Sequence, residues 1–279
     1  MRLTSFYGDD PREARLGIVT AEGVTDATAA TGMSSAEFFT RGFEALERLK
    51  LVDIEPFNGS LDGLALAPVV PRPGKILCVG LNYAQHADEA GLPRPKEPVL
   101  FSKFNNSLAA HGARVSVAGL KRVDYEAELG IVLGRGGRDI SEGDALSHVL
   151  GCFNANDVSE RALQNVSSQW LLGKTLDGFL PIGPELLTLD EAGDPDSMRV
   201  RGWLNGELRQ DSNTSDMIFG VAEIVSYISR FMTLDAGDII VTGTPEGVIL
   251  GKEDREWVKP GDEFIVQLGD LTPLVTRFS

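Results

Sequence analysis

The sequence predicts a mainly β protein with some α-helix, arranged as one large domain preceded by a small one. The chain has 279 residues, more than the roughly 100–200 of a typical single domain. Its 31 glycines and 14 prolines favour many turns between short strands over a helical bundle. Hydrophobic residues make up 42% of the chain, which is enough to bury a substantial core and argues against whole-chain disorder.

The first part of the chain predicts a small α+β unit. Alternating or apolar residues indicate strands at 3–7 and 16–20. A helix is expected at 34–50, because apolar residues recur there at roughly helical spacing. Ser34 and Glu37 at its start have the spacing of a capping box.

A proline-rich connector follows, at Pro68, Pro71 and Pro73. Stiff segments of this kind often separate domains, so we expect an accessory domain at 1–70 and the main domain at 71–279. The main domain is expected to contain strands at 76–79, 99–103, 126–133, 149–154, 200–204, 238–241 and 263–268, and a helix at 221–232.

The charge of the chain limits its partners. The formal net charge is -15 and the sequence pI is about 4.6. Because basic residues are not clustered, nucleic acid and anionic membrane surfaces would be repelled. A small anionic substrate remains compatible if a metal or a few placed cations reverse the local field.

The cysteines and the hydrophobicity pattern bear on the compartment. Cys78 and Cys152 lie in apolar runs and are expected to be buried thiols of a reducing compartment. The N-terminus lacks the hydrophobic core of a signal peptide, and apolar runs stay short of membrane-spanning length. We therefore expect a cytoplasmic location.

Three acidic residues are candidates for a metal site. In an extended strand, Glu126 and Glu128 project from the same face, roughly 6–7 Å apart. For an isolated pair, the solvated face of an amphipathic strand is the commoner explanation, but Asp157 ends a second apolar run and adds a third acid. Three oxygen ligands favour a hard cation, Mg²⁺ or Mn²⁺ before Zn²⁺.

His86 and Glu89 lie three residues apart in the polar segment after the strand at 76–79. If this segment forms a helical turn, they share a face, and the carboxylate can fix the imidazole tautomer and raise its basicity. The alternative is an ordinary surface turn.

Arg161 and Gln164 follow Asp157 closely. On one helical turn the three would form a stripe at i, i+4 and i+7, from which Arg161 would hold a carboxylate or pair with Asp157. Lys174 follows an apolar segment at 170–172 that can carry it inward, although most lysines are solvated.

The segment 242–247, TGTPEG, follows an apolar strand. Its glycines allow close backbone approach, and the Thr244 hydroxyl and backbone N–H groups could hold a carboxylate. A tight hairpin turn is the alternative. The segment lacks the lysine and the spacing of a phosphate-binding loop, so nucleotide binding is disfavoured.

Seven segments in the same order resemble the fumarylacetoacetate hydrolase family: GLNYAQHADEAG, EPVLFSKF, VDYEAELGIVLG, NDVSER, SQWLLGKTLDGFLPIGP, LNGELRQ and GDIIVTGTPEGV. The resemblance runs from about Gly74 to the C-terminus, roughly three-quarters of the chain. The region before it looks like the small, variable accessory domain of many bacterial members. The resemblance implies a mixed β-sandwich roll around a metal, usually in a homodimer.

The resemblance also implies roles for individual residues. Glu126, Glu128 and Asp157 would be the metal ligands, with Mg²⁺ or Mn²⁺ as the cofactor. The other roles implied are a catalytic dyad of His86 and Glu89 on a mobile lid, Lys174 on the substrate's oxo or enolate oxygen, and Arg161, Gln164 and Thr244 on its carboxylate. One departure from the family is Ala162, where many members have an acidic residue. Because that residue is not a metal ligand, the change puts in doubt the contacts that support the ligands, and not metal binding itself.

The expected activity is metal-dependent hydrolysis of a carbon–carbon bond in a 1,3-dioxo acid of the acylpyruvate type, which releases a metal-stabilised pyruvate enolate. Oxaloacetate decarboxylation is the nearest alternative, and the wording of KFNNSLAAH and SQWLLGKTLDGF resembles such members. An isomerase of an unsaturated 2-oxo diacid would use the same scaffold. A non-catalytic metal-binding or ligand-binding protein is a different class, and the set His86, Glu89 and Lys174 weighs against it.

Overall fold

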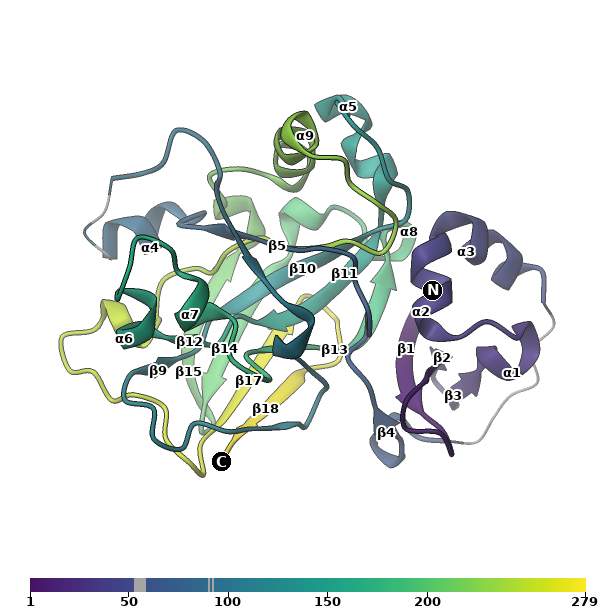
Figure 1. The fold of residues 1–279 in the computed structure, drawn as a ribbon, viewed down its shortest axis with the longest axis horizontal. Coiled ribbons are helices and arrows are strands. Elements are labelled where there is room, and N and C mark those ends of the chain that lie inside the picture. Colours follow the sequence, from purple (N-terminus) through teal and green to yellow (C-terminus); the bar gives the residue numbers. More distant parts are fainter. Residues whose placement is uncertain (53–58, 90, 92) are drawn as a thin grey trace.

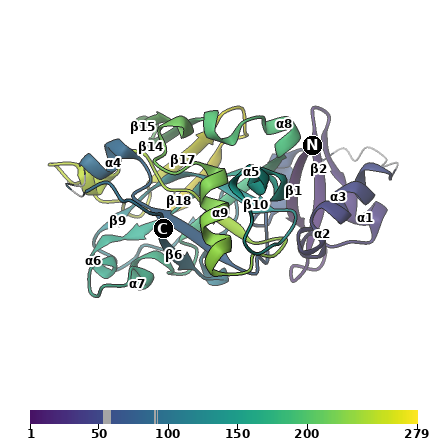
Figure 2. The same cartoon turned by 90° about the horizontal axis from the view of Figure 1, so that it is seen from above.

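The computed structural model describes residues 1–52, 59–89, 91 and 93–279. Two β-sheets pack against each other, and short helices cover the outside (Figure 1). Figure 2 shows the first three helices gathered at one end of the molecule and α4, α6 and α7 at the other. The predicted class, mainly β with some α in a mixed roll, is confirmed.

The larger sheet contains antiparallel and parallel neighbours. Its strands, in their order across the sheet, are β3 (Gly23–Asp26), β2 (Ala14–Thr20), β1 (Arg2–Tyr7), β13 (Leu180–Thr188), β11 (Val149–Asn156), β10 (Ala127–Leu133), β16 (Ile239–Val241), β5 (Ile76–Gly80) and β6 (Val99–Lys103). Two short strands lie off this path, β4 (Ala65–Leu66) beside β1 and β7 (Leu108–Ala109) beside β13. The pairing of β1 with β13 joins the N-terminal strands to the rest of the sheet. The domain boundary expected near residue 70 stays a prediction.

The second sheet has the order β15 (Glu207–Asn213), β14 (Arg199–Leu204), β17 (Glu263–Leu268), β18 (Leu274–Phe278) and β8 (Arg114–Val115). A separate pair is formed by β9 (Val123–Asp124) and β12 (Ser159–Glu160). The rings of Tyr125 and Phe264 stack between the two sheets with their centroids 4.0 Å apart.

The helices are α1 (Ala27–Thr31), α2 (Ser35–Arg41), α3 (Phe43–Lys50), α4 (Ala84–Glu89), α5 (Glu142–Ala145), α6 (Arg161–Gln164), α7 (Leu171–Lys174), α8 (Leu189–Ala192) and α9 (Val221–Phe231). The helix predicted at 221–232 is confirmed as α9, which buries its apolar face. Among the helices that the structure describes, none combines the length and apolarity needed to cross a bilayer.

The prediction of one helix over 34–50 is wrong, because Gly42 divides it into α2 and α3. Gly42 has φ 55°, and a Cβ there would lie 2.0 Å from the carbonyl oxygen of Gly134. The N–H of Phe43 donates to the same oxygen at 2.9 Å. Helical spacing of apolar residues continues across the break, so the close approach to Gly134 is invisible in the sequence.

Among the described strands of more than two residues, β3, β13, β15 and β18 were not predicted. In β13, Pro181, Gly183 and Pro184 interrupt the β-like pattern, yet the strand is buried along its whole length. The strand is held by three neighbours: β7 pairs with Leu180 and Pro181, β11 pairs with Ile182 and Gly183, and both β11 and β1 pair with Leu186 and Leu187. Tertiary pairing therefore overrides local propensity.

Side chains on the two faces of β10 have different surroundings. Ala127, Leu129, Ile131 and Leu133 belong to the core shared with the second sheet and α9. Val132 belongs to a different core, formed with α2, α3 and neighbouring strands. Because the side-chain period is two, Glu128 shares the face of Val132. The strand is fully buried, so this places a carboxylate inside the protein.

Candidate functional site

A cavity of about 330 Å³ opens between α4, α6, α7 and the ends of the central strands. Its apolar wall includes Val79, Phe101, Trp170 and Leu250. Gly80 makes room for this wall, because a Cβ there would lie 2.6 Å from the Trp170 ring. The polar residues that line the cavity are His86, Glu126, Glu128, Arg161, Gln164, Asn165, Lys174 and Thr244.

The structure brings Glu126, Glu128 and Asp157 together. One carboxylate oxygen of each lies within 4.8 Å of the others, and all three residues are buried. The antiparallel pairing of β10 and β11 places the start of one strand beside the end of the other. The N–H of Asp157 donates to the Glu126 carbonyl at 2.9 Å, one residue beyond the last pair of the two strands.

Lys174 lies among these carboxylates. Its Nζ donates to Glu126 Oε2 and to Asp157 Oδ2, both at 2.6 Å. Burial opposes ionisation of Lys174, but the charges of Asp157 and Glu126 outweigh it and raise the pKa of the ammonium. Burial likewise opposes ionisation of Glu126, and Lys174 and Arg161 overcome it and hold the pKa of that carboxyl well below its usual range.

Glu128 differs from its two neighbours because it has no cationic partner among the described residues. It accepts a hydrogen bond from the N–H of Gly243 at 2.7 Å. Burial and the charges of Asp157 and Glu126 raise its pKa well above the usual range. A bound cation would remove this conflict.

Asp157 Oδ1 also fits a cation. The Nζ of Lys103 lies 2.6 Å away, but its hydrogen bonds go to the carbonyls of Val158 and Phe179, so Oδ1 makes an ion pair without an aligned hydrogen bond. An under-coordinated buried oxygen beside two further carboxylates is a donor set that suits a hard cation such as Mg²⁺ or Mn²⁺.

Arg161 and Gln164 share helix α6, and Asp157 lies outside it, after the end of β11. The predicted helical stripe of all three residues is therefore wrong. Arg161 Nη2 donates to Glu126 Oε1 at 2.7 Å, and Nη1 donates to Gln164 Oε1 at 3.0 Å. The guanidinium is largely bonded within the protein, and Gln164, which also lines the cavity, uses its amide oxygen in the bond from Arg161.

His86 and Glu89 lie on α4, as the helical-turn alternative predicted. His86 lines the cavity, and its Nδ1 makes no hydrogen bond within the described structure. Glu89 Oε2 lies 3.7 Å from that nitrogen, too far for a hydrogen bond. Its carboxylate accepts instead from the N–H of Gly247, at 3.3 and 3.2 Å. The ring of His86 therefore faces the cavity, and Glu89 docks α4 onto the 247–251 segment.

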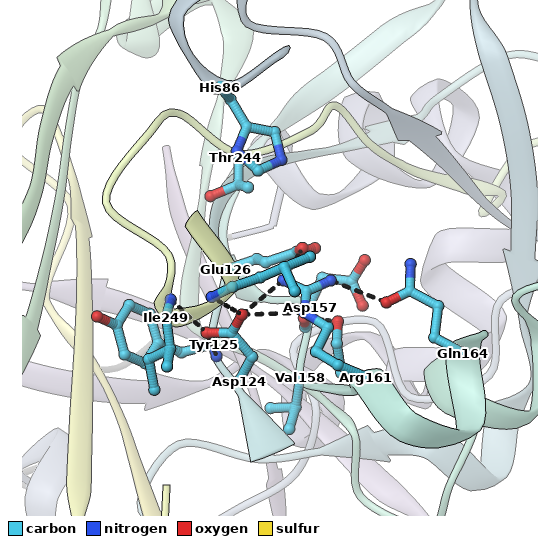
Figure 3. Close-up of polar contacts among 12 residues, drawn as sticks. His86, Asp124, Tyr125, Glu126, Asp157, Val158, Arg161, Gln164, Thr244 and Ile249 are labelled. Carbon is cyan, nitrogen blue, oxygen red and sulfur yellow. Dashed lines mark hydrogen bonds and ion pairs between the residues drawn. The ribbon is translucent and has the colours of Figure 1, made fainter. Parts of the chain in front are cut away.

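Thr244 also lines the cavity, but its hydroxyl is engaged. It donates to the Ala127 carbonyl at 3.0 Å and accepts from Gln210 Nε2 at 2.8 Å. Donation to a substrate carboxylate would require it to release Ala127. Figure 3 shows how His86, Thr244, Glu126, Arg161 and Gln164 lie around the site.

Three buried residues at the site were not predicted: Lys103, Asp124 and Gln210. Asp124 had a signal, because it continues the period of two defined by Glu126 and Glu128. Lys103 is the last residue of an apolar strand, and Gln210 lies in a strand whose other residues are mostly polar. Their local sequence therefore does not indicate burial.

A mixed β roll whose buried carboxylates and lysine open into one cavity has a cluster of acidic groups that could hold a metal ion. Residues 75–279 match the family model described as "Fumarylacetoacetate (FAA) hydrolase C-terminal". The chain belongs to the fumarylacetoacetate hydrolase family, as its motifs predicted, and is an enzyme of that family.

Similar proteins cover nearly the whole chain. "Oxaloacetate tautomerase fahd2, mitochondrial" of Xenopus laevis is 36% identical over 280 residues, covering 97% of this chain and 88% of the relative. "Oxaloacetate tautomerase FAHD2B, mitochondrial" of Bos taurus is 38% identical over 287 residues, covering 99% and 91%. Both names place those relatives in mitochondria, and the cytoplasmic location expected here stays a prediction.

Among solved structures, a putative HpcE protein from Mycobacterium smegmatis has a TM-score of 0.91 at 35% identity, covering 100% of this chain and 99% of that one. A maleylpyruvate hydrolase from Sphingobium has a TM-score of 0.80 at 28% identity, with 100% of both chains covered. Similar folds therefore occur in relatives with differently named activities.

Proposed function

We propose that the chain catalyses keto–enol tautomerisation of oxaloacetate or a closely related 2-oxo diacid. The observation that carries this proposal is the placement of His86 and Lys174 on the same cavity. His86 supplies an imidazole that can move a proton, and Lys174 supplies a fixed positive charge. The names of the relatives quoted above support the choice of oxaloacetate.

Tautomerisation moves one proton between the C2 oxygen and C3 of the diacid. His86 would remove the proton from C3 or return it, since it lines the cavity and an imidazole can both accept and donate a proton. Lys174 is held protonated by Glu126 and Asp157, so it acts as a donor and not as a base. Two of its three N–H groups are committed, and the third can bond the developing enolate oxygen.

A divalent cation, Mg²⁺ or Mn²⁺, would be held by Glu126, Glu128 and Asp157 and would supply further positive charge for the enolate. Gln164 would direct its amide nitrogen to a substrate carboxylate. The apolar wall formed by Phe101 and Trp170 keeps the local dielectric low, which strengthens these contacts.

The test measures the decay of enol oxaloacetate by ultraviolet absorbance, with Mg²⁺ or Mn²⁺ present. We expect His86→Gln to slow the enzymatic rate by about 10²-fold or more, with Mn²⁺ affinity unchanged. His148→Gln is the matched control, because His148 is half-buried and lies outside the cavity. Wild-type protein that leaves the decay at its uncatalysed rate would refute the proposal.

Hydrolysis of an acylpyruvate is the second candidate, because His86 lines the cavity and a carboxylate oxygen of Glu89 lies 3.7 Å from its Nδ1. In that reaction His86 would take a proton from water, and hydroxide would attack the distal carbonyl.

Three assays run side by side distinguish the candidate activities. Cleavage of acetylpyruvate indicates a hydrolase, CO₂ release from oxaloacetate a decarboxylase, and faster enol decay a tautomerase. The homodimer expected from the sequence stays a prediction, which light scattering tests.

A further inference from the structure

Asp124 is a buried carboxylate outside the cavity, at the end of β9. Its Oδ1 accepts from the N–H groups of Ile249 and Tyr125, at 2.9 and 3.0 Å. Its Oδ2 accepts from the Leu250 N–H at 3.0 Å and from Arg161 Nε at 2.9 Å. One side chain thus joins a strand end, a turn and helix α6 (Figure 3).

On one side, Asp124 reaches the carboxylate site through Arg161. The guanidinium bridges two carboxylates, with Nη2 2.9 Å from Asp124 Oδ2 and 2.7 Å from Glu126 Oε1. Both contacts are buried. The position of Asp124 therefore determines how much of the Arg161 charge falls on Glu126, the residue that also pairs with Lys174.

On the other side, Asp124 holds the turn at 249–251, against which α4 packs. Leu250 lines the cavity. Gly251 lies so close to Glu89 that a Cβ there would be 2.2 Å from Glu89 Cδ. Because two backbone N–H groups of this turn bond one carboxylate, a shift of Asp124 moves the surface on which the His86 helix rests.

We propose that Asp124 is a positioning residue that couples the cation site to the 249–251 turn. Occupation of the carboxylate site fixes Glu126, and Arg161 and Asp124 carry that constraint to Ile249 and Leu250. The wall that supports His86 is thereby ordered when the cation binds. The inference rests on the cation site of the proposed function, and it is independent of which substrate is turned over.

The first experiment uses wild-type protein and Mn²⁺ alone. Hydrogen–deuterium exchange, resolved to single amides, is measured with and without the metal. We expect the Ile249 and Leu250 amides to exchange more slowly with Mn²⁺, although neither residue supplies a ligand. The control amides are Lys75 and Asp235, which donate to the buried carboxylate of Asp238 away from the cavity. Equal changes at all four amides, or none at Ile249 and Leu250, would overturn the proposal.

The second experiment compares Asp124→Asn with Asp238→Asn. Both carboxylates are fully buried and accept two or more backbone N–H groups and one cationic side chain, so both substitutions destabilise the fold. Only Asp124→Asn should weaken Mn²⁺ binding, by about tenfold or more in calorimetry, because Arg161 would then pair with Glu126 alone. Wild-type Mn²⁺ affinity in folded Asp124→Asn would contradict the inference. If that variant does not fold, the exchange measurement on wild-type protein decides.

Discussion

Lys103 Nζ lies 2.6 Å from Asp157 Oδ1, and both side chains are fully buried. Asp157 thus contacts two lysines, Lys103 through Oδ1 and Lys174 through Oδ2. Burial lowers the pKa of Lys103, although the charge of Asp157 opposes the shift. The ammonium also bonds two backbone carbonyls, so it joins the site to the surrounding chain.

Lys103→Met should therefore destabilise the metal-free protein by about 3 kcal/mol, because it leaves a buried carboxylate short of one partner and orphans two carbonyls. Urea unfolding in the presence of a chelator measures this. The control, Lys75→Met, removes a half-buried lysine from Asp238 and should cost less, since solvent reaches the site. Equal losses for the two variants would argue against a special role for Lys103.

The two glutamates at the site should respond differently to amide replacement. Glu126→Gln leaves Lys174 and Arg161 short of a partner, so it should lower stability and Mn²⁺ affinity together. Glu128→Gln removes the carboxylate that lacks a cation, so it should lower Mn²⁺ affinity while the metal-free protein stays as stable or gains stability. Calorimetry and urea unfolding of both variants distinguish these outcomes, and a destabilised metal-free Glu128→Gln would be inconsistent with the geometry.

The stability of metal-free protein should depend on pH through Glu128. Burial and neighbouring charges raise the pKa of Glu128 above its usual value of 4.5, so the folded state holds this proton more tightly than the unfolded state. Its contribution is complete below pH 4.5 and is lost as pH rises through the folded pKa. Glu126, whose pKa is lowered, acts in the opposite sense below pH 4.5.

Unfolding in urea across a pH series, with chelator present, tests this dependence. Wild-type protein should lose stability as pH rises above 4.5, and Glu128→Gln should lose less over the same interval. Added Mn²⁺ should reverse the trend, because it favours the ionised carboxylate. Identical pH profiles for the two proteins would show that Glu128 is not the group responsible.

Docking of Glu89 on the 247–251 segment can be tested at Gly251. A Cβ at this position would overlap Glu89, so Gly251→Ala should displace the carboxylate and α4. We expect turnover of oxaloacetate to fall by about tenfold, since small displacements of a positioned catalytic group are costly. Gly143→Ala is the control, because its Cβ meets open space. Unchanged turnover in Gly251→Ala would mean that the position of Glu89 is unimportant.

The break between α2 and α3 is testable through stability. Gly42→Ala should destabilise the protein by more than the roughly 1–2 kcal/mol that left-handed backbone costs a residue with a Cβ. Gly42 has φ 55° and ψ -122°, outside the left-handed helical region, and the new Cβ also meets the Gly134 carbonyl. Gly32 also has a positive φ, but a Cβ there would meet open space, so Gly32→Ala should cost only the backbone strain. Thermal or urea unfolding compares them, and equal losses would exclude a role for the Gly134 contact.

The elements with a clear apolar pattern could be predicted, because local pattern decides where they begin and end. The buried strand at 76–79 and the amphipathic helix at 221–232 are confirmed, since each buries a continuous or periodic apolar face. The helix at 34–50 was predicted unbroken and β13 was missed. In both cases the deciding contact comes from a segment far away in the chain, Gly134 for the first and the flanking strands for the second.

The sequence by itself determined the family, the fold class and the three acids that meet at the site, because ordered motifs and a period of two are local properties. Only the tertiary structure decided which charges pair. Lys174 lies between Glu126 and Asp157, and Asp124 reaches both Arg161 and the 249–251 turn. Glu128 pairs with no cationic side chain in the part of the chain that the structure describes. Such pairings depend on distances between residues far apart in the chain, and folding alone sets those distances.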